Sequence, residues 1–296
     1  MGANNPQTIR LIDHINSSDN GTYYEILGWI DNDRSKVDKE IFGYKVLGTF
    51  EILKEDVYKE CYLVNNITTN ANVRDESIKQ VRAYNLPFES LIHPSVNTEL
   101  VAIGNGCIIH ENVVLEAGVN VEDFSVISSG SIICHETKIG KCSFISSGVK
   151  IAGLVDVQEC VTIYLGALIT PRVVLEAGSI ISAGSVVFEN VAKNTKVLGN
   201  PAKKISDVIS DKQIGSAGTT EEKLEELFSR EFKSLLNLKK NEYFADYDLL
   251  PSFEMLRLIT FLEEEFQIKI LDNEIDEMNL GSFENIITYI NNKNSL

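Results

Sequence analysis

Aliphatic residues occupy every sixth position from residue 103 to residue 187 without a break. They are Ile103, Ile109, Leu115, Val121, Ile127, Ile133, Ile139, Ile145, Ile151, Val157, Ile163, Ile169, Leu175, Ile181 and Val187. The residues two positions earlier are all small or β-branched: Val101, Cys107, Val113, Val119, Ser125, Ser131, Thr137, Ser143, Val149, Val155, Val161, Ala167, Val173, Ser179 and Ser185. A helix repeats about every 3.6 residues and a half-buried strand every 2, so neither explains a period of six. One bulky and one small inward residue per hexad is typical of a β-helix.

Three hexads make one triangular coil, so the fifteen hexads predict five stacked coils of eighteen residues. Each coil would hydrogen-bond to the next and extend the core in one dimension. At the spacing of neighbouring strands the prism would be roughly 24 Å tall. Hexad β-helices resemble one another in being left-handed, an exception to the right-handed crossover rule. We therefore expect a left-handed parallel β-helix over residues 91–205.

Residues 1–90 alternate between helical and strand patterns, which predicts a small parallel α/β domain of Rossmann-like type. An apolar helical face lies at 9–15, strand patterns lie at 24–30 and 61–64, and a helix is expected at about 72–84.

Loops after parallel strands gather at one edge of a sheet, so residues 2–6 and 31–33 would share a crevice there. A glycine turn before a helix can hold phosphate through backbone N–H groups, which makes Gly2 and Asn4 candidates. The alternative is an ordinary turn beside a solvated acidic loop. This architecture also needs a strand before Gly2, so either that strand is truncated or the sheet starts differently.

The C-terminal quarter predicts a separate small helical bundle. Residues 206–218 are polar and contain Gly-Ser-Ala-Gly, which is typical of a flexible linker. Thr219 and Glu222 have the spacing of a capping box, and an amphipathic helix follows them. A second helix is expected at 252–266 and a last one around Ile286–Ile290, so 219–296 form the third domain.

The amino-acid composition limits the kinds of molecule that the protein can bind and the compartment in which we expect it. The net charge is −16, and residues 216–296 carry 17 acidic against 8 basic residues. Such acidity argues against nucleic acid and anionic membranes. No apolar run approaches the ~20 residues of a membrane span, and no signal-peptide pattern opens the sequence, so we expect a cytoplasmic protein. Five cysteines without a CxxC pair indicate reduced thiols rather than disulfides or zinc.

The hexads, the small domain before them and the run Gly199-Asn200-Pro201-Ala202-Lys203 together resemble a known family. The family that they resemble is that of the bacterial nucleotide-sugar N-acyltransferases of surface-polysaccharide biosynthesis. Members of that family acylate 4-amino sugars, and the sialic acid O-acetyltransferases are their relatives. The resemblance implies a homotrimer, a nucleotide-linked amino sugar as acceptor and an acyl thioester such as acyl-CoA as donor.

The family's catalytic motif, a histidine and an acidic residue before an Ile-Gly hexad, is matched by His135 and Glu136. His135 lies two positions after the inward Ile133, so the register points it outward, toward a neighbouring subunit in a trimer. A neutral imidazole can accept a proton from an attacking amine near pH 7. Glu136 would orient the ring and stabilise the imidazolium.

The resemblance also implies roles for neighbouring positions. Gly153 sits where a backbone N–H would stabilise the thioester oxyanion, although it could simply let a coil corner turn. Ala183 falls where the family normally has a donor-groove glycine, and Ser128 falls where the family can have an asparagine near the histidine.

The loop of the first domain departs from the family pattern. The family reads G-x-x-G-H, whereas this chain reads Gly-Ala-Asn-Asn-Pro at residues 2–6. Asp31 and Asp33 are therefore the better candidates for contacting the nucleotide base.

The last domain resembles an acyl carrier protein. Pro251-Ser252-Phe253 stands where carriers have D-S-L or D-S-F, and LEEEF with a short I-x-I follows at 262–270. Ser252 would carry 4′-phosphopantetheine, attached by a phosphopantetheinyl transferase. A helix N-terminus suits the phosphodiester because its free N–H groups face the anion. Pro251 replaces the usual aspartate, and Ser252 as a plain N-cap is the alternative.

These features predict an N-acyltransferase acting on a nucleotide-linked amino sugar, with a tethered acyl carrier. O-acylation of a sugar hydroxyl and a non-catalytic trimeric scaffold are the alternatives.

A β-helix with a zinc site of carbonic anhydrase type needs about three suitable histidines. Only His110 and His135 lie within the coils, so no metal is expected. His14 and His93 are interpreted, like His110, as structural or solvent-facing.

Overall fold

The computed structural model describes residues 1–3, 5–18, 21–67, 71–208, 219–232, 240–244, 258–259, 261–263, 265–266, 268–271 and 274–294. The chain divides into two compact units, residues 1–210 and residues 211–296. The predicted boundary between 1–90 and 91–205 falls inside the first unit.

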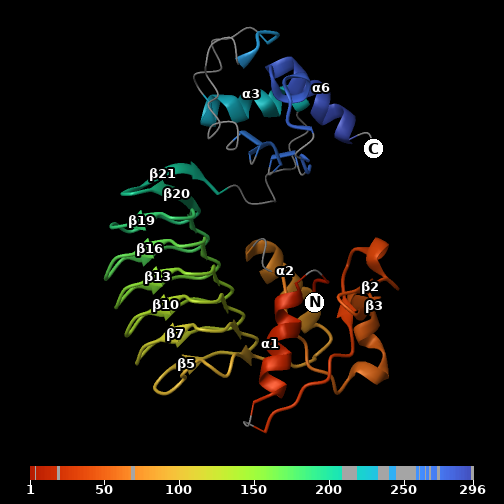
Figure 1. The fold of residues 1–296 in the computed structure, drawn as a ribbon, viewed down its shortest axis with the longest axis vertical. Coiled ribbons are helices and arrows are strands. Elements are labelled where there is room, and N and C mark those ends of the chain that lie inside the picture. Colours follow the sequence, from red (N-terminus) through yellow and green to blue (C-terminus); the bar gives the residue numbers. More distant parts are fainter. Residues whose placement is uncertain are drawn as a thin grey trace. The chain divides into compact units, whose positions relative to one another are not determined.

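The hexad segment forms a parallel β-helix, seen as a stack of coils in Figure 1. Each hexad supplies one two-residue strand: β5 (Ala102–Ile103), β6 (Ile108–Ile109), β7 (Val114–Leu115), β8 (Asn120–Val121), β9 (Val126–Ile127), β10 (Ile132–Ile133), β11 (Lys138–Ile139), β12 (Phe144–Ile145), β13 (Lys150–Ile151), β14 (Asp156–Val157), β15 (Thr162–Ile163), β16 (Leu168–Ile169), β17 (Val174–Leu175), β18 (Ile180–Ile181) and β19 (Val186–Val187). The chain enters the coils through β4 (Leu91–Ile92).

The strands make three sheets, one on each face of the prism. Sheet I holds β5, β8, β11, β14 and β17; sheet II holds β4, β6, β9, β12, β15, β18 and the closing hairpin; sheet III holds β7, β10, β13, β16 and β19. Pairing joins residues eighteen apart, so Ile133 lies between Leu115 and Ile151. These three side chains are buried in one aliphatic core. The predicted hexad β-helix is confirmed, and its parallel sheets fit the left-handed type.

The corners of the prism repeat a backbone feature as well. One residue in each hexad has a positive φ: Leu100, Gly106, Asn112, Gly118, Phe124, Gly130, Glu136, Cys142, Gly148, Leu154, Cys160, Gly166, Arg172, Gly178 and Gly184. Glycine adopts this left-handed conformation without a steric penalty, whereas other residues are strained there by about 1–2 kcal/mol. The hydrophobic column and the inter-coil hydrogen bonds hold the non-glycine residues in this conformation.

The coils end in an antiparallel hairpin. Strand β20 (Thr195–Gly199) pairs in parallel with β18 and antiparallel with β21 (Ala202–Asp207). The Gly-Asn-Pro-Ala-Lys run forms the turn between them. Its antiparallel return replaces the next coil, which is why the six-residue period stops here.

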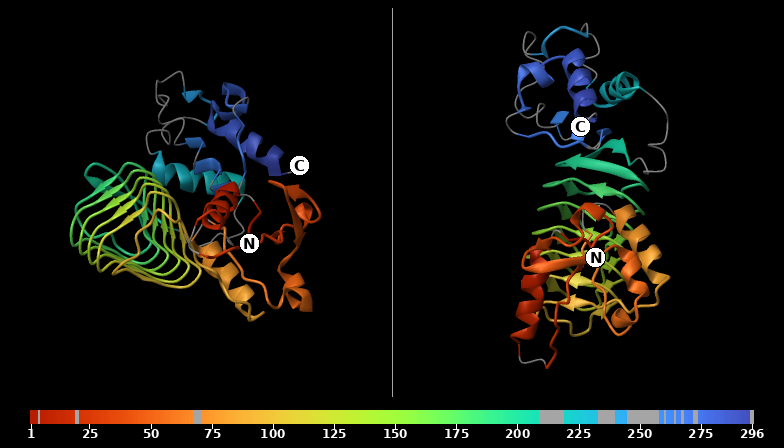
Figure 2. Two further views of the ribbon diagram at one scale, coloured as in Figure 1. Left: turned by 60° about the horizontal axis from the view of Figure 1, so that its bottom comes forward. Right: turned by 90° about the vertical axis from the view of Figure 1, so that its right-hand side faces the viewer.

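The first ninety residues form a small mixed α/β layer against the β-helix (Figures 1 and 2). Its elements are α1 (Pro6–Asn16), β1 (Trp29–Ile30), η1 (Arg34–Lys36), β2 (Glu40–Ile41), β3 (Tyr44–Gly48), η2 (Phe50–Lys54), η3 (Asp56–Tyr58) and α2 (Ala71–Arg82). Strand β3 pairs in parallel with β1 and antiparallel with β2. The sheet is therefore mixed, not wholly parallel as predicted.

The predicted strands of this layer are only partly paired. The 24–30 pattern is a named strand only at Trp29–Ile30, and the 61–64 pattern contributes a single bridge between Leu63 and Phe88. Helix α1 packs its Leu11, Ile12 and Ile15 against the outward side chains of sheet II, including Leu91, Ile108 and Val126.

The second unit has a compact apolar core. Its described helices are α3 (Thr220–Glu231), α5 (Glu277–Leu280) and α6 (Phe283–Asn294). The capping box of Thr219 and Glu222 is present and confirms that prediction. The described residues of the expected second helix, 258–259, 261–263 and 265–266, are helical. The buried core comprises Leu224, Leu227, Phe228, Phe232, Phe244, Leu258, Ile259, Phe261, Leu262, Ile270, Leu280, Phe283, Ile286, Tyr289 and Ile290.

The inward column can be tested with two substitutions on strand β13. Ile151 is fully buried, whereas its neighbour Lys150 is exposed. Ile151→Asp buries an unpaired carboxylate at a cost of several kcal/mol, so we expect loss of the cooperative thermal transition. Lys150→Asp should leave that transition within a few degrees of its original midpoint. Equal behaviour of the two variants in a circular-dichroism melt would mean that the inward register is wrong.

Candidate functional site

His135 stands at a corner of the prism, directly after strand β10. The strand order places this corner between sheet III and sheet I. The backbone N–H of His135 donates to the Glu116 carboxylate at 2.8 Å, and its carbonyl accepts from the N–H of Leu154. The backbone is thereby fixed on both sides. The imidazole points outward with 58% of the side chain exposed, so it is available to a ligand and contributes little to the core.

Gly153 lies one coil away from His135 and is in close contact with its ring. A Cβ atom placed on Gly153 would be 2.5 Å from Nε2 of His135 and 2.6 Å from Cε1. The backbone of Gly153 does not have a left-handed φ, so the turn alone does not require glycine. The close approach of the imidazole does require it, so the contact with His135, and not the turn, explains the glycine at this corner.

The N–H of Gly153 makes no hydrogen bond within the described part of the chain. At equivalent corners, the corner N–H donates to the side chain that lies nineteen residues earlier in the sequence. The N–H of His135 donates to Glu116 in this way, and the N–H of Ala177 donates to Gln158. The residue in that position for Gly153 is Cys134. A short thiol replaces the carboxylate or amide, so the Gly153 N–H is left beside the His135 ring without a side-chain acceptor.

Glu136 is adjacent to the ring without being bonded to it. Its Oε2 lies 3.6 Å from Nδ1 of His135, which is an ion-pair distance and longer than a good hydrogen bond. The residue has a φ of 54°, one of the strained corner positions. A small rotation of either exposed side chain would close the gap, so Glu136 can support a positive charge on the imidazole.

Ser128 and Ala183 lie at a different corner. They follow β9 and β18, which belong to sheet II, and precede strands of sheet III. Ser128 and Ala183 are three coils apart along that corner, because β9 pairs with β12, β12 with β15 and β15 with β18. Within one chain, the structure therefore groups His135 with Gly153 and brings neither Ser128 nor Ala183 to that corner.

The N-terminal layer lies against one face of the prism (Figure 2, left). The contacts of α1 identify this face as sheet II, and the strand order places it opposite the corner that holds His135. Gly2, Asp31 and Asp33 belong to this layer, and Asn4 lies outside the described residues. One chain therefore separates the predicted acceptor-binding residues from the predicted base by the width of the prism.

The predicted crevice residues do lie together. The N–H of Ala3 donates to Oδ2 of Asp31 at 3.0 Å, and Lys36 contacts the same oxygen at 3.0 Å. Burial raises the pKa of Asp31, but hydrogen bonds from Ala3, Asp33 and Lys36 outweigh it and leave that pKa below its ordinary value. Asp33 caps η1 by accepting from the N–H of Ser35. Both carboxylates thus stay ionised and already hold the loops together.

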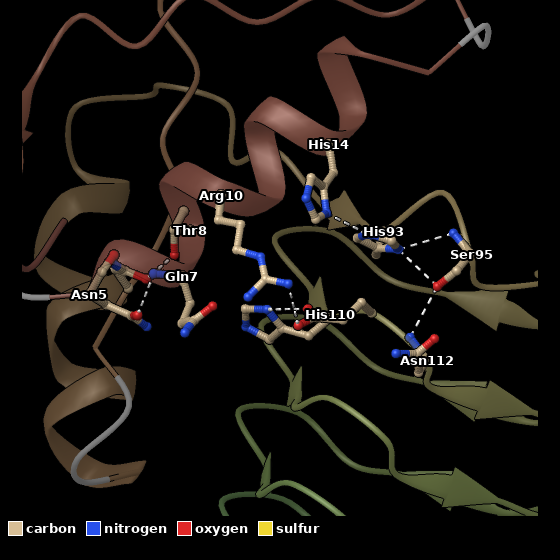
Figure 3. Close-up of polar contacts among 11 residues, drawn as sticks. Asn5, Gln7, Thr8, Arg10, His14, His93, Ser95, His110 and Asn112 are labelled. Atoms are coloured by element: carbon tan, nitrogen blue, oxygen red, sulfur yellow. Dashed lines mark hydrogen bonds and ion pairs between the residues drawn. The ribbon is translucent and has the colours of Figure 1, made fainter.

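A histidine cluster at the junction of α1 and the first coil was not identified as a group from sequence (Figure 3). Nδ1 of His14 lies 2.8 Å from Nε2 of His93. Because Nδ1 of His93 accepts from the N–H of Ser95, the neutral His93 ring carries its proton on Nε2 and donates it to His14. Burial, followed by the charge of His14, lowers the pKa of His93.

His110 lies beside this cluster, together with the ion pair of Arg10 and Glu111 at 3.7 Å (Figure 3). Burial lowers the pKa of His110. No group of three or more His, Cys, Asp or Glu side chains among the described residues could hold a metal ion. Proximity between residues far apart in sequence creates the cluster, so spacing along the chain carries no signal for it.

The carrier-type motif cannot be placed. Pro251 and Ser252 both lie outside the described residues. No described helix is both long enough and apolar enough to cross a membrane.

No known protein-family model matches the chain. A protein from Schizosaccharomyces pombe with the provisional name acetyltransferase C18B11.09c is 29% identical over 113 residues, which are 38% of this chain and 46% of that protein. The chain thus spans less than half the length of this curated relative.

Several solved structures share the fold of the first unit. PerB from Caulobacter crescentus, in complex with CoA and GDP-perosamine, matches with a TM-score of 0.62 and 22% identity, over 69% of this chain and 95% of PerB. The acetyltransferase domain of PglB from Neisseria gonorrhoeae has a TM-score of 0.62 and 23% identity, over 69% of this chain and 96% of the PglB domain. WeeI from Acinetobacter baumannii has a TM-score of 0.60 and 19% identity, over 69% of this chain and 96% of WeeI. At these identities the likeness shows the fold alone.

The contact between Gly153 and the imidazole can be tested by Gly153→Ala. The new methyl group would displace the exposed ring of His135, so the NMR chemical shifts of that ring should change while the melting temperature stays nearly constant. Gly130→Ala is the matched control, because Gly130 has a φ of 72° and nothing within 4 Å of the added Cβ. It should cost about 1 kcal/mol of stability through backbone strain and leave the chemical shifts of the His135 ring as they were.

Proposed function

We propose that this protein is an acyltransferase that moves an acyl group from a phosphopantetheine-type thioester to the amine of a nucleotide-linked amino sugar. The observation that carries the proposal is the exposed His135 imidazole close to Gly153, a residue whose N–H makes no hydrogen bond within the described part of the chain. The shared fold of PerB, which was crystallised with CoA and GDP-perosamine, and of the PglB domain, crystallised also with acetyl coenzyme A, supports this substrate class.

Each group at the His135 corner has a place in amide formation. Nε2 of His135 accepts a proton as the sugar amine attacks the thioester carbonyl carbon. The Gly153 N–H donates to the resulting oxyanion, and Glu136 stabilises the imidazolium. The C–S bond then breaks, the carbonyl re-forms, and the thiolate leaves with the proton from the imidazolium. No metal is required for these steps.

The complete site is formed between copies of the chain in a homotrimer. Asp31, Asp33, Gly2 and Asn4 belong to the layer that covers sheet II, whereas the proposed base stands at the opposite corner. A neighbouring copy is needed to bring the acceptor-binding loops to His135. In the same arrangement Ser128 would contact the acceptor substrate, and Ala183, three coils further along the prism, would line the groove for the donor.

The second unit serves as a tethered acyl carrier. Ser252 carries 4′-phosphopantetheine, added by a phosphopantetheinyl transferase. The polar linker was predicted at 206–218, but Ser206 and Asp207 belong to β21, so the linker that lets the carrier reach the β-helix begins after Asp207. A linker of this kind gives an effective concentration in the millimolar range, which helps when free thioester is scarce. Free acyl-CoA remains an alternative donor for the same site.

His135→Ala tests the base. With acetyl-CoA and GDP-perosamine as probes, the rate of amide formation should fall roughly 10²- to 10⁴-fold, the usual contribution of general-base catalysis. Glu136→Gln should cause a smaller loss because it removes only the supporting charge. The melting temperature of both variants should match the parent, since neither side chain is in the core. A His135→Ala enzyme that kept most of its rate would remove His135 from the mechanism.

Ser252→Ala tests the carrier. Protein co-expressed with a competent phosphopantetheinyl transferase should gain the mass of one phosphopantetheine group per chain, and Ser252→Ala should gain none. The variant should lose turnover that starts from the loaded carrier but keep any turnover with free acetyl-CoA. Absence of added mass on the parent chain would contradict delivery by this domain and leave the acyl-CoA reaction unaffected.

A further inference from the structure

Two cysteines occupy equivalent positions in successive coils, at the corner between sheet I and sheet II. Cys142 follows β11 and Cys160 follows β14, and the N–H of Cys160 donates to the carbonyl of Lys141 at 2.8 Å. Both cysteines have the left-handed backbone, with φ of 58° and 57°. Their side chains therefore leave the backbone in the same direction. We call these two residues the thiol pair.

The spacing of the thiol pair suits a disulfide. Strand β11 pairs with β14 and β12 pairs with β15, so the two coils are in register on both sides of the pair. Neighbouring strands lie about 4.8 Å apart, and a disulfide needs a Cα separation of about 4.4–6.8 Å. Both cysteines are free thiols. Rotation of the two side chains is therefore enough to bring the sulfur atoms to bonding distance.

The two thiols differ in their access to solvent. Cys142 is fully buried in a cluster with Phe124 and with Ile78 of α2. Arg74 of the same helix donates to the Cys142 carbonyl at 2.8 Å. Cys160 packs against the edge of this cluster and is partly exposed. A small molecule from solution can therefore reach Cys160, whereas α2 shields Cys142.

The surroundings of the pair favour a thiolate on Cys160. Hydrogen bonding from the Cys142 thiol is the main cause that lowers the pKa of Cys160, and the Arg74 guanidinium adds to it, against burial and the charge of Asp75. The same hydrogen bond, followed by burial, raises the pKa of Cys142. Oδ1 of Asp75 lies 3.7 Å from Sγ of Cys142. Cys160 is thus suited to attack, and Cys142 to react second, with Asp75 placed to accept its proton.

We propose that the thiol pair is a site of thiol–disulfide exchange, at which a low-molecular-weight disulfide such as oxidised glutathione converts Cys142 and Cys160 into a disulfide between successive coils. The Cys160 thiolate attacks one sulfur of oxidised glutathione, and one glutathione thiolate leaves. Cys142 gives its proton to Asp75, attacks the Cys160 sulfur and releases the second glutathione thiolate. The two glutathione thiolates take up the two protons that the cysteines lose. The protein thiols are oxidised and glutathione disulfide is reduced.

The reaction does not involve the His135 corner, which lies between sheets III and I, so its test needs no acyl transfer. The reduced full chain is incubated with oxidised glutathione, exchange is stopped with acid, and free thiols are blocked with N-ethylmaleimide. Trypsin cleaves after Lys150 and so separates Cys142 from Cys160. Mass spectrometry of the unreduced digest should show these two peptides cross-linked in most chains.

Cys134 is the internal control thiol, because it is also partly exposed. Burial, followed by the charge of Glu116, raises the pKa of Cys134. We therefore expect Cys160 to exchange at least about tenfold faster than Cys134. Equal rates at the two residues would contradict the proposal.

Two serine variants assign the steps. Cys142→Ser should retain one glutathione on Cys160, because the second thiol is missing. Cys160→Ser should form no adduct on Cys142, because that thiol is buried. A circular-dichroism melt checks the folding of each variant, and the peptide map of the parent chain decides the outcome if a variant does not fold. A parent chain without the cross-link, a Cys142→Ser chain without the adduct, or an adduct on Cys142 in Cys160→Ser would overturn the proposal.

Discussion

The structure depends on one repeated contact, the stacking of an inward aliphatic side chain on its equivalents eighteen residues before and after. Ile133 between Leu115 and Ile151 is a typical case, and all three are buried. The contact fixes the register of every strand, because a shift of one residue would turn the whole column toward solvent. It also supports the strained corner residues, whose left-handed backbone is held by the coils on either side.

The same contact leaves the corners free to vary. Folding uses the inward positions, so an exposed corner residue can change without disturbing the column. His135 and Glu136 occupy such positions. The replacement of a capping carboxylate by Cys134 and the presence of glycine at residue 153 change only local hydrogen bonding and space. Together these corner changes leave an exposed imidazole next to a glycine whose N–H has no hydrogen-bond partner among the residues that the structure describes, and the proposed chemistry rests on this arrangement.

A rigid prism also keeps its corners apart. Sheet II is covered by the N-terminal layer, and the His135 corner lies on the opposite side. The coils cannot bend to bring the two together, so the proposed acceptor loops and base meet only when another copy supplies one of them.

Within the N-terminal layer the constraint is different. Its sheet is short and mixed, and Asp31 holds its loops through the N–H of Ala3 and the ammonium of Lys36.

The sequence alone determined the β-helix, because a period of six over residues 103–187 leaves only that fold for the inward side chains. The sequence also determined that His135 points outward and that Thr219 with Glu222 begins a helix. Contacts between distant segments decided the rest. The imidazole of His135 against Gly153 and the pair of His14 and His93 both join residues that the folded backbone brings together. Local patterns do not encode such contacts, because they arise from how coils, layers and loops pack in space.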